Sequence, residues 1–357
     1  MWNESFFSAP QLKCDSLGAH ENLSEYSGRK GGQVIRTAIF VATALSAAPP
    51  VSALAQQLKL SADVGKTEFF EGEPVYLLVR LDNVGTDTAW VTFFGLGSLP
   101  VMLSLTRGNG NPVPVHMPFI DWLAPPNWRG DPIAPGGSVI NTLVLQDLAG
   151  DEQASRSHLF LFRFTPDRYE LHLEFSAHAG VLGTTPLLLK AAPVSFRVRE
   201  RTAAEEAEVK ELESMRDMAW DTIRVDRYAR LAGYKDALIH WIEQRLRDQP
   251  DDPFLPFLLD NGVYGLGPIL MRQLDAGKLP RFDPDTSEVV SRLRLAVIER
   301  QKFSTGGTRL VQALSARHPE QLAALANSLG SSPSGDMARY QVKVSLLLQR
   351  SSSRPQR

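Results

Sequence analysis

The spacing of apolar residues changes once along the chain, close to Thr202. Between residues 56 and 200, apolar and polar residues alternate in short runs that are rich in β-branched and aromatic side chains, a pattern typical of strands. The predicted strands cover residues 73–83, 89–94, 101–106, 113–117, 138–145 and 158–164. The sequence Gly108-Asn109-Gly110-Asn111 predicts a hairpin turn, because Asn and Gly tolerate positive φ angles.

After Thr202 the apolar residues recur every three or four positions, which is the period of amphipathic helices. Pro284 suits a first helical turn, Gly306-Gly307 is expected to interrupt the helical region, and Gly330 is expected to close a helix. The predicted helices cover residues 203–216, 218–231, 234–246, 287–303, 308–317, 320–329 and 337–348. The fold class is therefore β then α, with an antiparallel β-sandwich at 56–200 and an α-helical domain of hairpins or an irregular bundle at 201–349.

Two stretches of the first half resemble immunoglobulin-like domains. Residues 165–173, TPDRYELHL, resemble a tyrosine corner, in which a phenol hydroxyl bonds to the backbone a few residues upstream. Residues 71–85, EGEPVYLLVRLDNVG, resemble the early strands of cysteine-free bacterial immunoglobulin-like modules. The resemblance implies a sandwich and favours binding or spacing, without implying an activity.

One stretch of the second half resembles a single unit of a tetratricopeptide-like repeat. This stretch is YKDALIHWIEQRLRDQPDDP, residues 234–253, in which Ala and large apolar residues share a helix face and Pro follows. No second copy recurs at a constant period, so a repeat array and an irregular bundle both stay open.

Residues 34–55 have the pattern of a secretory leader. A short apolar run follows Arg36, two prolines end it, and Ala53-Leu54-Ala55 provides a small-x-small cleavage site before Gln56. Residues 1–33 are polar and do not fit such a leader, so they are either a mis-annotated extension ahead of a later start or a disordered tail. A second disordered tail is expected at 350–357. The predicted location is the periplasm or the outside of the cell.

Charge and cysteine content narrow the possible functions. The net charge is −2 with both signs interspersed, which argues against nucleic acid and anionic membrane surfaces as partners. The only cysteine, Cys14, precedes the leader, so the mature chain has no disulfide, thiol nucleophile or thiolate metal site. No stable membrane span is expected in the mature chain, and the sequence implies no cofactor.

The strand rhythm is interrupted at residues 118–137, PFIDWLAPPNWRGDPIAPGG. Long loops are often functional, and aromatic faces stack on sugars, prolines or cations. The candidate ligand-binding residues are Phe119, Trp122, Trp128 and Arg129. The alternative is structural, with the tryptophans capping an open end of the sandwich.

Catalytic motifs are absent from the sequence, and two groups of residues were weighed as candidates. His116, His158, His172 and His178 lie in the strand half, and scattered surface positions are favoured over a metal site, with His172 expected to face solvent. Asp251, Asp252 and Asp260 lie near Phe254, Phe257 and Tyr264, either as a carboxylate cleft for glycoside hydrolysis or as helix caps.

These observations favour an exported bacterial non-catalytic protein that binds a protein or polysaccharide through sandwich loops, a helical groove or both. Two alternatives stay open. One is an extracytoplasmic hydrolase with its cleft in the helical domain, and the other is a structural spacer of the cell envelope.

Overall fold

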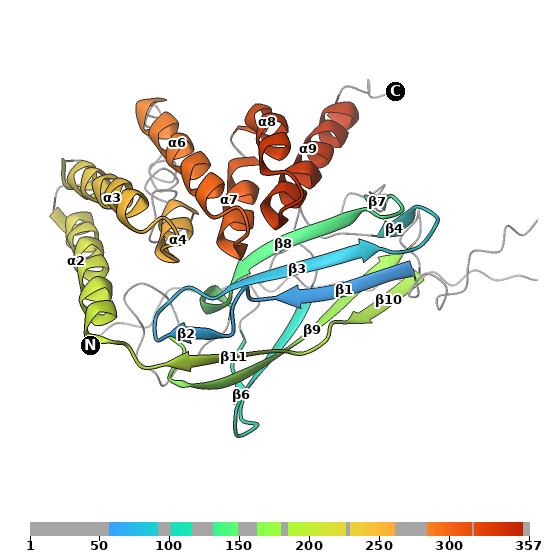
Figure 1. The fold of residues 1–357 in the computed structure, drawn as a ribbon, viewed down its shortest axis with the longest axis horizontal. Coiled ribbons are helices and arrows are strands. Elements are labelled where there is room, and N and C mark those ends of the chain that lie inside the picture. Colours follow the sequence, from blue (N-terminus) through green and yellow to red (C-terminus); the bar gives the residue numbers. More distant parts are fainter. Residues whose placement is uncertain are drawn as a thin grey trace, which may run out of the picture. The chain divides into compact units, whose positions relative to one another are not determined.

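The computed structural model describes residues 57–91, 101–115, 131–148, 163–179, 185–225, 229–260, 284–315 and 318–352, which all belong to one compact unit, Ala48–Arg357 (Figure 1). Strands in the first half are followed by helices in the second, as the sequence predicts. The predicted leader at 34–55, the segment at 1–33 and the candidate binding residues lie outside the described residues.

The strands end at Arg199, and the predicted strands at 73–83, 101–106 and 138–145 are confirmed. The β5–β6 hairpin turns at Gly110, whose φ is 80°, as the sequence predicts. The strands are β1 (Leu58–Asp63), β2 (Glu68–Phe70), β3 (Tyr76–Asn83), β4 (Ala89–Val91), β5 (Val101–Arg107), β6 (Pro112–Val113), β7 (Asp131–Ile133), β8 (Ser138–Val144), β9 (Asp167–Ala179), β10 (Thr185–Lys190) and β11 (Val194–Arg199).

These strands form two sheets. The small sheet is antiparallel, with the order β1-β3-β8, and the other eight strands build a large sheet around β9. β9 pairs with β4 and β5 along one edge and with β10 and β11 along the other, always antiparallel. β2 joins the large sheet by pairing in parallel with β11.

Side chains along β3 contact the large sheet and the helices in alternation, so the small sheet lies between them. Leu77, Val79 and Leu81 are fully buried and share one hydrophobic cluster with residues of the large sheet. Tyr76 and Leu78 belong instead to the cluster formed by the helices. Because successive strand residues point to opposite faces, β3 contacts the large sheet on one side and the helices on the other.

The helices follow one another beside the small sheet (Figure 1). They are α2 (Ala203–Val225), α3 (Ala229–Asp248), α4 (Phe254–Asp260), α6 (Pro284–Arg300), α7 (Thr305–Ser315), α8 (Pro319–Leu329) and α9 (Pro333–Ser352). Consecutive helices contact each other as the pairs α2–α3, α6–α7 and α8–α9, while α7 and α9 contact β8. The α7–β8 contact includes a hydrogen bond of 2.8 Å between the Thr142 and Thr308 hydroxyls.

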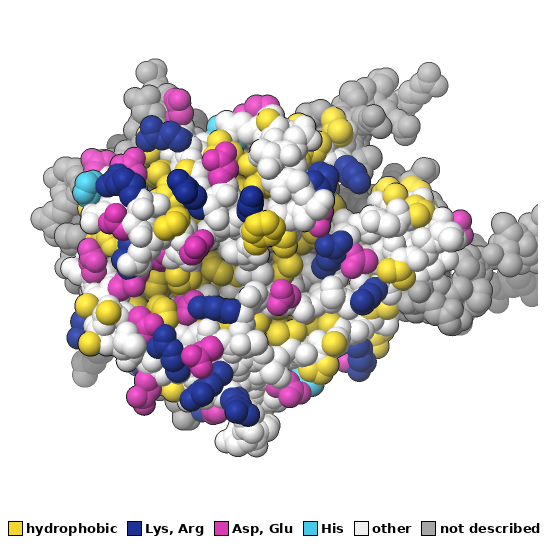
Figure 2. Space-filling view, in the orientation of Figure 1, with side chains coloured by type: hydrophobic (Ala, Val, Ile, Leu, Met, Phe, Trp, Pro, Cys, Tyr) yellow, Lys and Arg dark blue, Asp and Glu magenta, His cyan; other side chains and the backbone are white. Residues whose placement is uncertain are grey.

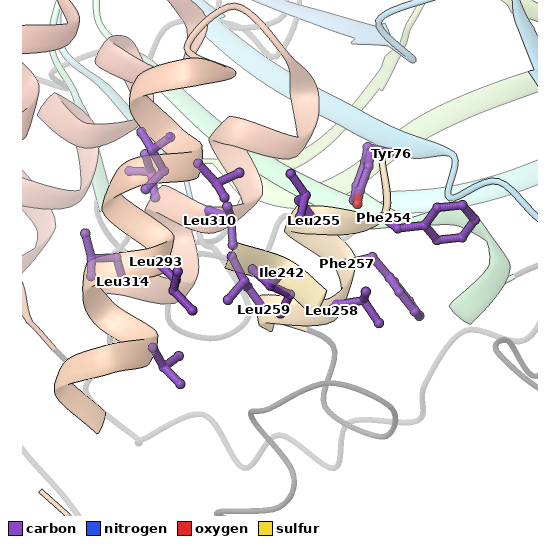
Figure 3. Packing of buried hydrophobic residues seen from close by; sticks show 14 of the residues in the cluster. Tyr76, Ile242, Phe254, Leu255, Phe257, Leu258, Leu259, Leu293, Leu310 and Leu314 are labelled. Atoms are coloured by element: carbon purple, nitrogen blue, oxygen red, sulfur yellow. The ribbon is translucent and has the colours of Figure 1, made fainter. Parts of the chain in front are cut away.

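α4 lies at the centre of the helical core, although the sequence did not predict it as a helix. Six of its seven residues, Phe254–Leu259, are buried. Figure 3 shows its side chains packed among Tyr76 of β3, Ile242 of α3 and Leu310 of α7. A continuous apolar run has no helical period, so its pattern does not distinguish a buried helix from a strand.

The connection from the sheets to the helices is tightly bonded. The Thr202 amide donates to Glu205 Oε2 at 2.8 Å, and the Glu205 amide donates to Thr202 Oγ1 at 3.3 Å, which is a reciprocal capping box. Arg199, the last residue of β11, donates to both Glu205 carboxylate oxygens at 2.7 and 2.6 Å. These contacts lower the pKa of Glu205 to about 2, led by the Arg199 hydrogen bonds.

Two details of the predicted elements are corrected. Gly306 and Gly307 do not interrupt the helical region but lie in the first turn of α7; the break is at residues 301–304. A Cβ at Gly307 would lie 2.4 Å from the Gln301 carbonyl oxygen and 2.7 Å from Ser334 Oγ, so the glycine permits close packing. The predicted strand at 158–164 is wrong at its end: Arg163 and Phe164, the residues of this range that the structure describes, lie outside any strand.

Candidate functional site

Along one edge of the large sheet, the described pairing is interrupted in two neighbouring rows. In the first row, β4 and β5 both pair with the same edge of β9, with Val91 opposite Ala179 and Val101 opposite Phe175. Nine residues, 92–100, join the two strands, whereas only three, 176–178, separate their partners on β9. The stretch of chain between β4 and β5 is therefore longer than the stretch of β9 between their partners.

The second row repeats this interruption. β6 pairs with β5 and β7 pairs with β4, so β6 and β7 form the outermost row, joined by residues 116–130. Asp131 lies opposite Val91, where the first inserted segment begins. Phe119, Trp122, Trp128 and Arg129 belong to the second segment and lie outside the described residues. Val91 and Asp131, the described residues that adjoin segments 92–100 and 116–130, thus lie opposite each other at this edge.

Apolar side chains lie on the exposed face beside these two residues. Trp90 is partly exposed and opposite Pro132, between the buried Ala89 and Val91. Met102 of β5 and Leu188 of β10 are 50% and 54% exposed. We call Trp90, Met102, Pro132 and Leu188 the apolar outer face. Exposed apolar surface of this kind is often used for binding.

The rest of the same face is polar. Further along β9, Glu170 and His172 are paired at 2.8 Å, and Glu174 pairs with Lys190 of β10. His172 points away from the buried Leu171 and Leu173, so its predicted solvent-facing orientation is confirmed. The apolar outer face is therefore local to the interrupted edge rather than general to the sheet.

The other histidines stay untested as ligands. His116 and His158 lie outside the described residues, and for His178 only the backbone position in β9 is described. Among the part of the chain that the structure describes, no group of three or more His, Cys, Asp or Glu side chains is arranged to hold a metal ion.

Two of the three acidic residues considered for a cleft, Asp252 and Asp260, lie in separate ion pairs. Asp252 precedes α4, Asp260 is its last residue, and Asp251 is exposed. Asp260 Oδ2 lies 2.8 Å from Arg309 Nε, and Arg309 Nη1 also donates to the Thr142 carbonyl at 3.2 Å. Tyr264 lies outside the described residues.

Asp252 is the helix cap that the sequence offered as one alternative, and it also has a buried ionic partner. Its Oδ1 accepts the Phe254 amide at 2.8 Å, and its Oδ2 lies 2.9 Å from Arg245 Nε of α3. The same guanidinium contacts Glu208 of α2 through Nη2. Burial and the neighbouring Glu208 carboxylate raise the pKa of Asp252 to about 7.

Sequence reasoning found Asp252 but missed Glu208 and Arg245. Both lie on helices with many charged residues. In such helices, the sequence does not distinguish a charged side chain that faces solvent from one that pairs with a buried group. Trp90 was also missed as a surface residue, because a tryptophan inside a strand pattern is normally expected to be buried. The packing of α2 against α3 identifies Glu208 and Arg245, and strand register identifies Trp90.

Charges of both signs are interspersed on the face in view in Figure 2, with hydrophobic side chains between them. This distribution agrees with the near-zero net charge of the chain. On the described residues of that face, electrostatics offer no reason to prefer a polyanionic partner.

Comparisons with known proteins give this chain no family. No family model matches it, and no curated protein matches it. One solved structure, described as "X-ray structure of Northeast Structural Genomics Consortium target SoR45", is 12% identical over 40% of this chain and 89% of that chain, with a TM-score of 0.25. Another, "pT26-6p", is 8% identical over 82% of this chain and 48% of that chain, with a TM-score of 0.16. Likenesses this low carry no argument about fold or function.

Proposed function

We propose that this chain is an exported, non-catalytic binding protein that captures a protein or polysaccharide at the interrupted edge of its large sheet. The observation that carries the proposal is the pairing of Val91 with Asp131, the described residues that adjoin segments 92–100 and 116–130, beside the apolar outer face. One segment holds Phe119, Trp122, Trp128 and Arg129, and the other holds Phe93 and Phe94. Aromatic rings next to an exposed apolar surface suit sugar rings and apolar peptide side chains, with the guanidinium available for a polar contact.

The proposal includes an immunoglobulin-like sandwich for the two sheets. Its support is the Tyr169 hydroxyl, which donates to the Thr165 carbonyl at 2.8 Å, the contact that defines a tyrosine corner. A single hydrophobic cluster with residues from both sheets is also what a sandwich requires. The helical pairs α2–α3, α6–α7 and α8–α9 support helical hairpins that back the small sheet.

Export is the second part of the proposal. β1 begins at Leu58, directly after the predicted cleavage site at Ala55, so cleavage there removes no described strand. Among the described residues, no helix has the length and apolar character needed to cross a membrane. Fractionation and N-terminal sequencing test this part: we expect a product that begins at Gln56 outside the cytoplasm, and an uncleaved cytosolic product would refute it.

Binding is tested with the mature chain immobilised on beads and exposed separately to envelope proteins and envelope polysaccharides. The variant Trp122→Ala/Trp128→Ala should keep its circular dichroism spectrum and lose retention at least tenfold, since base or sugar stacking on an aromatic ring contributes about 1–3 kcal/mol. The matched control is Phe303→Ala, which removes a 70% exposed aromatic ring from the α6–α7 connection.

Three outcomes decide the matter. Loss of retention in the double variant alone supports the proposed edge. Equal loss in the Phe303 control shows nonspecific aromatic adsorption and refutes it. Unfolding of the double variant shows that the tryptophans are structural, which returns the segment to its alternative role as a cap on the sandwich.

A further inference from the structure

Two carboxylates share one guanidinium where α2, α3 and α4 meet. Arg245 of α3 contacts Glu208 of α2 through Nη2 and lies 2.9 Å from Asp252 through Nε. The side chain of Asp252 is 2% exposed, while those of Glu208 and Arg245 are 18% and 20% exposed. Arg245 also lies over the Trp241 ring at 5.3 Å from its centroid, so its position is fixed from two sides.

Among the residues whose side chains the structure describes, none but Arg245 supplies a positive charge to the Asp252 carboxylate. On α2, Glu211 adds a further negative charge near Arg245. The Tyr76 hydroxyl of β3 donates to the Pro253 carbonyl at 2.7 Å. From the α6–α7 connection, the Gln301 amide donates to the Asp252 carbonyl at 3.0 Å, not to its carboxylate. Arg309 pairs with Asp260.

A buried pair of carboxylates with one cation carries an unbalanced negative charge, which binding of one proton removes. A proton on Asp252 leaves one carboxylate, Glu208, to balance the Arg245 guanidinium, and the protonated oxygen becomes a donor towards Glu208. We propose that Glu208, Arg245 and Asp252 form a proton-dependent lock that holds α2 against the α3–α4 junction. The lock is closed when the pair holds one proton and weakens when both carboxylates ionise.

The lock acts on the element that follows the large sheet directly. α2 begins after Thr202, at the capping box that joins it to β11, and its Glu208 is the point at which the carboxylate pair holds it. Loss of the proton therefore loosens α2 while its N-terminal end stays bonded to Arg199. This inference is independent of the proposed binding function, and it gives the helical layer a response to the pH of the surroundings.

The direction of the pH dependence follows from the linkage between proton binding and folding. The pKa of Asp252 is raised from 3.8 to about 7, so the folded state holds the proton over a range in which the unfolded state does not. The contribution to stability is fully present at low pH and is lost as pH rises towards 7. If opening of α2 returns Asp252 to ordinary solvation, the opening constant rises by about 50-fold between pH 5 and pH 7.

Hydrogen exchange of the α2 amides, corrected for the intrinsic pH dependence of exchange, measures this opening constant in the mature chain. In the wild type we expect the rise of about 50-fold. Glu208→Gln removes one charge of the pair but leaves Asp252 buried, so its opening constant should rise by far less than about 50-fold over the same range. Asp251→Asn, an exposed neighbour of the cluster, should behave as the wild type does.

A wild-type rise that persists in Glu208→Gln overturns the proposal, as does a flat wild-type profile. If Glu208→Gln does not fold, infrared spectroscopy of the wild type decides. A protonated carboxyl stretch that is present near pH 6, lost by about pH 9 and shifted by ¹³C-labelled aspartate supports the lock. Its absence near pH 6 refutes the lock.

Discussion

Replacing Gly307 with Ala tests whether the packing of α7 or its helix propensity dominates. Gly307 is in the first turn of α7, where its amide donates to Ser304 Oγ at 2.9 Å. Propensity alone predicts that Gly→Ala inside a helix stabilises by about 1 kcal/mol. The new methyl group, however, would lie 2.4 Å from the Gln301 carbonyl oxygen, where ordinary contact begins at 3.4 Å.

Relief of that overlap requires a backbone shift of about 1 Å, and the second overlap, with Ser334 Oγ at 2.7 Å, restricts the direction of the shift. Overpacking of this kind costs about 1–3 kcal/mol, and two overlaps place the cost at the upper end. We expect a net loss of about 2 kcal/mol in the free energy of unfolding after the propensity gain. Urea titration followed by circular dichroism measures it as a lower midpoint at unchanged m.

The matched control is Ala324→Gly at an exposed position of α8, which reports propensity alone and should cost about 1 kcal/mol. A Gly307→Ala variant that is as stable as the wild type, or more stable, would show that α6, α7 and α9 separate without cost. The close-packing argument would then be wrong.

Three further changes have definite expected outcomes. Tyr169→Phe removes the hydroxyl that donates to Thr165 and should cost about 1 kcal/mol in urea unfolding, with no change in the strand signal. Glu205→Gln should cost about 1–2 kcal/mol above about pH 5 and almost nothing near pH 2, because the stability from the lowered pKa is complete above the ordinary value of 4.5 and is lost as pH falls towards about 2; acid titration of both proteins checks this. Leu188→Ser on the apolar outer face should change the free energy of unfolding by less than about 0.5 kcal/mol while weakening retention on envelope ligands; unchanged retention would exclude this strand from the binding surface.

Much of the fold follows from local pattern. The alternation of residues 76–83 predicted β3, because Leu77, Val79 and Leu81 must all face one core. The change of period at Thr202 predicted the start of α2, and the capping box there explains why the boundary is sharp. These features depend on residues that are close together in the sequence, so they can be predicted from it.

The failures involve partners that are distant in sequence. The predicted break at Gly306-Gly307 is wrong: glycine lowers helix propensity, but Gln301 and Ser334 require the small size of Gly307 inside α7. α4 was missed because burial on all sides removes the periodic signal. The same limit applies to the acid cluster, since Asp252 is recognisable as a cap but its contact with Arg245 depends on how α3 folds back.

At the candidate binding edge, too, the sequence indicated which residue types to consider but not where they are placed. Composition identified Trp122 and Trp128 as unusual for a connecting segment, and that choice stays a prediction. What the sequence did not show is that Val91 and Asp131, which adjoin segments 92–100 and 116–130, lie opposite each other, a conclusion that needs the pairing of Val91 with both Asp131 and Ala179. The register of described strands, not composition, is the reason for proposing the two aromatic segments as one binding surface.

The order of the strands explains why the helices and this edge can act separately. Helical residues pack on Tyr76, Ile140 and Val144 of the small sheet and on Phe70 of β2, whereas the apolar outer face lies on β4, β5, β7 and β10 of the large sheet. A movement of α2 governed by the Glu208–Asp252 pair would reach the large sheet through β11, whose Arg199 is bonded to Glu205, and would then have to cross β9 to reach β4 and β5. Because closely packed cores transmit displacement only through discrete rearrangement, a pH response confined to α2 should leave ligand retention at the edge unchanged.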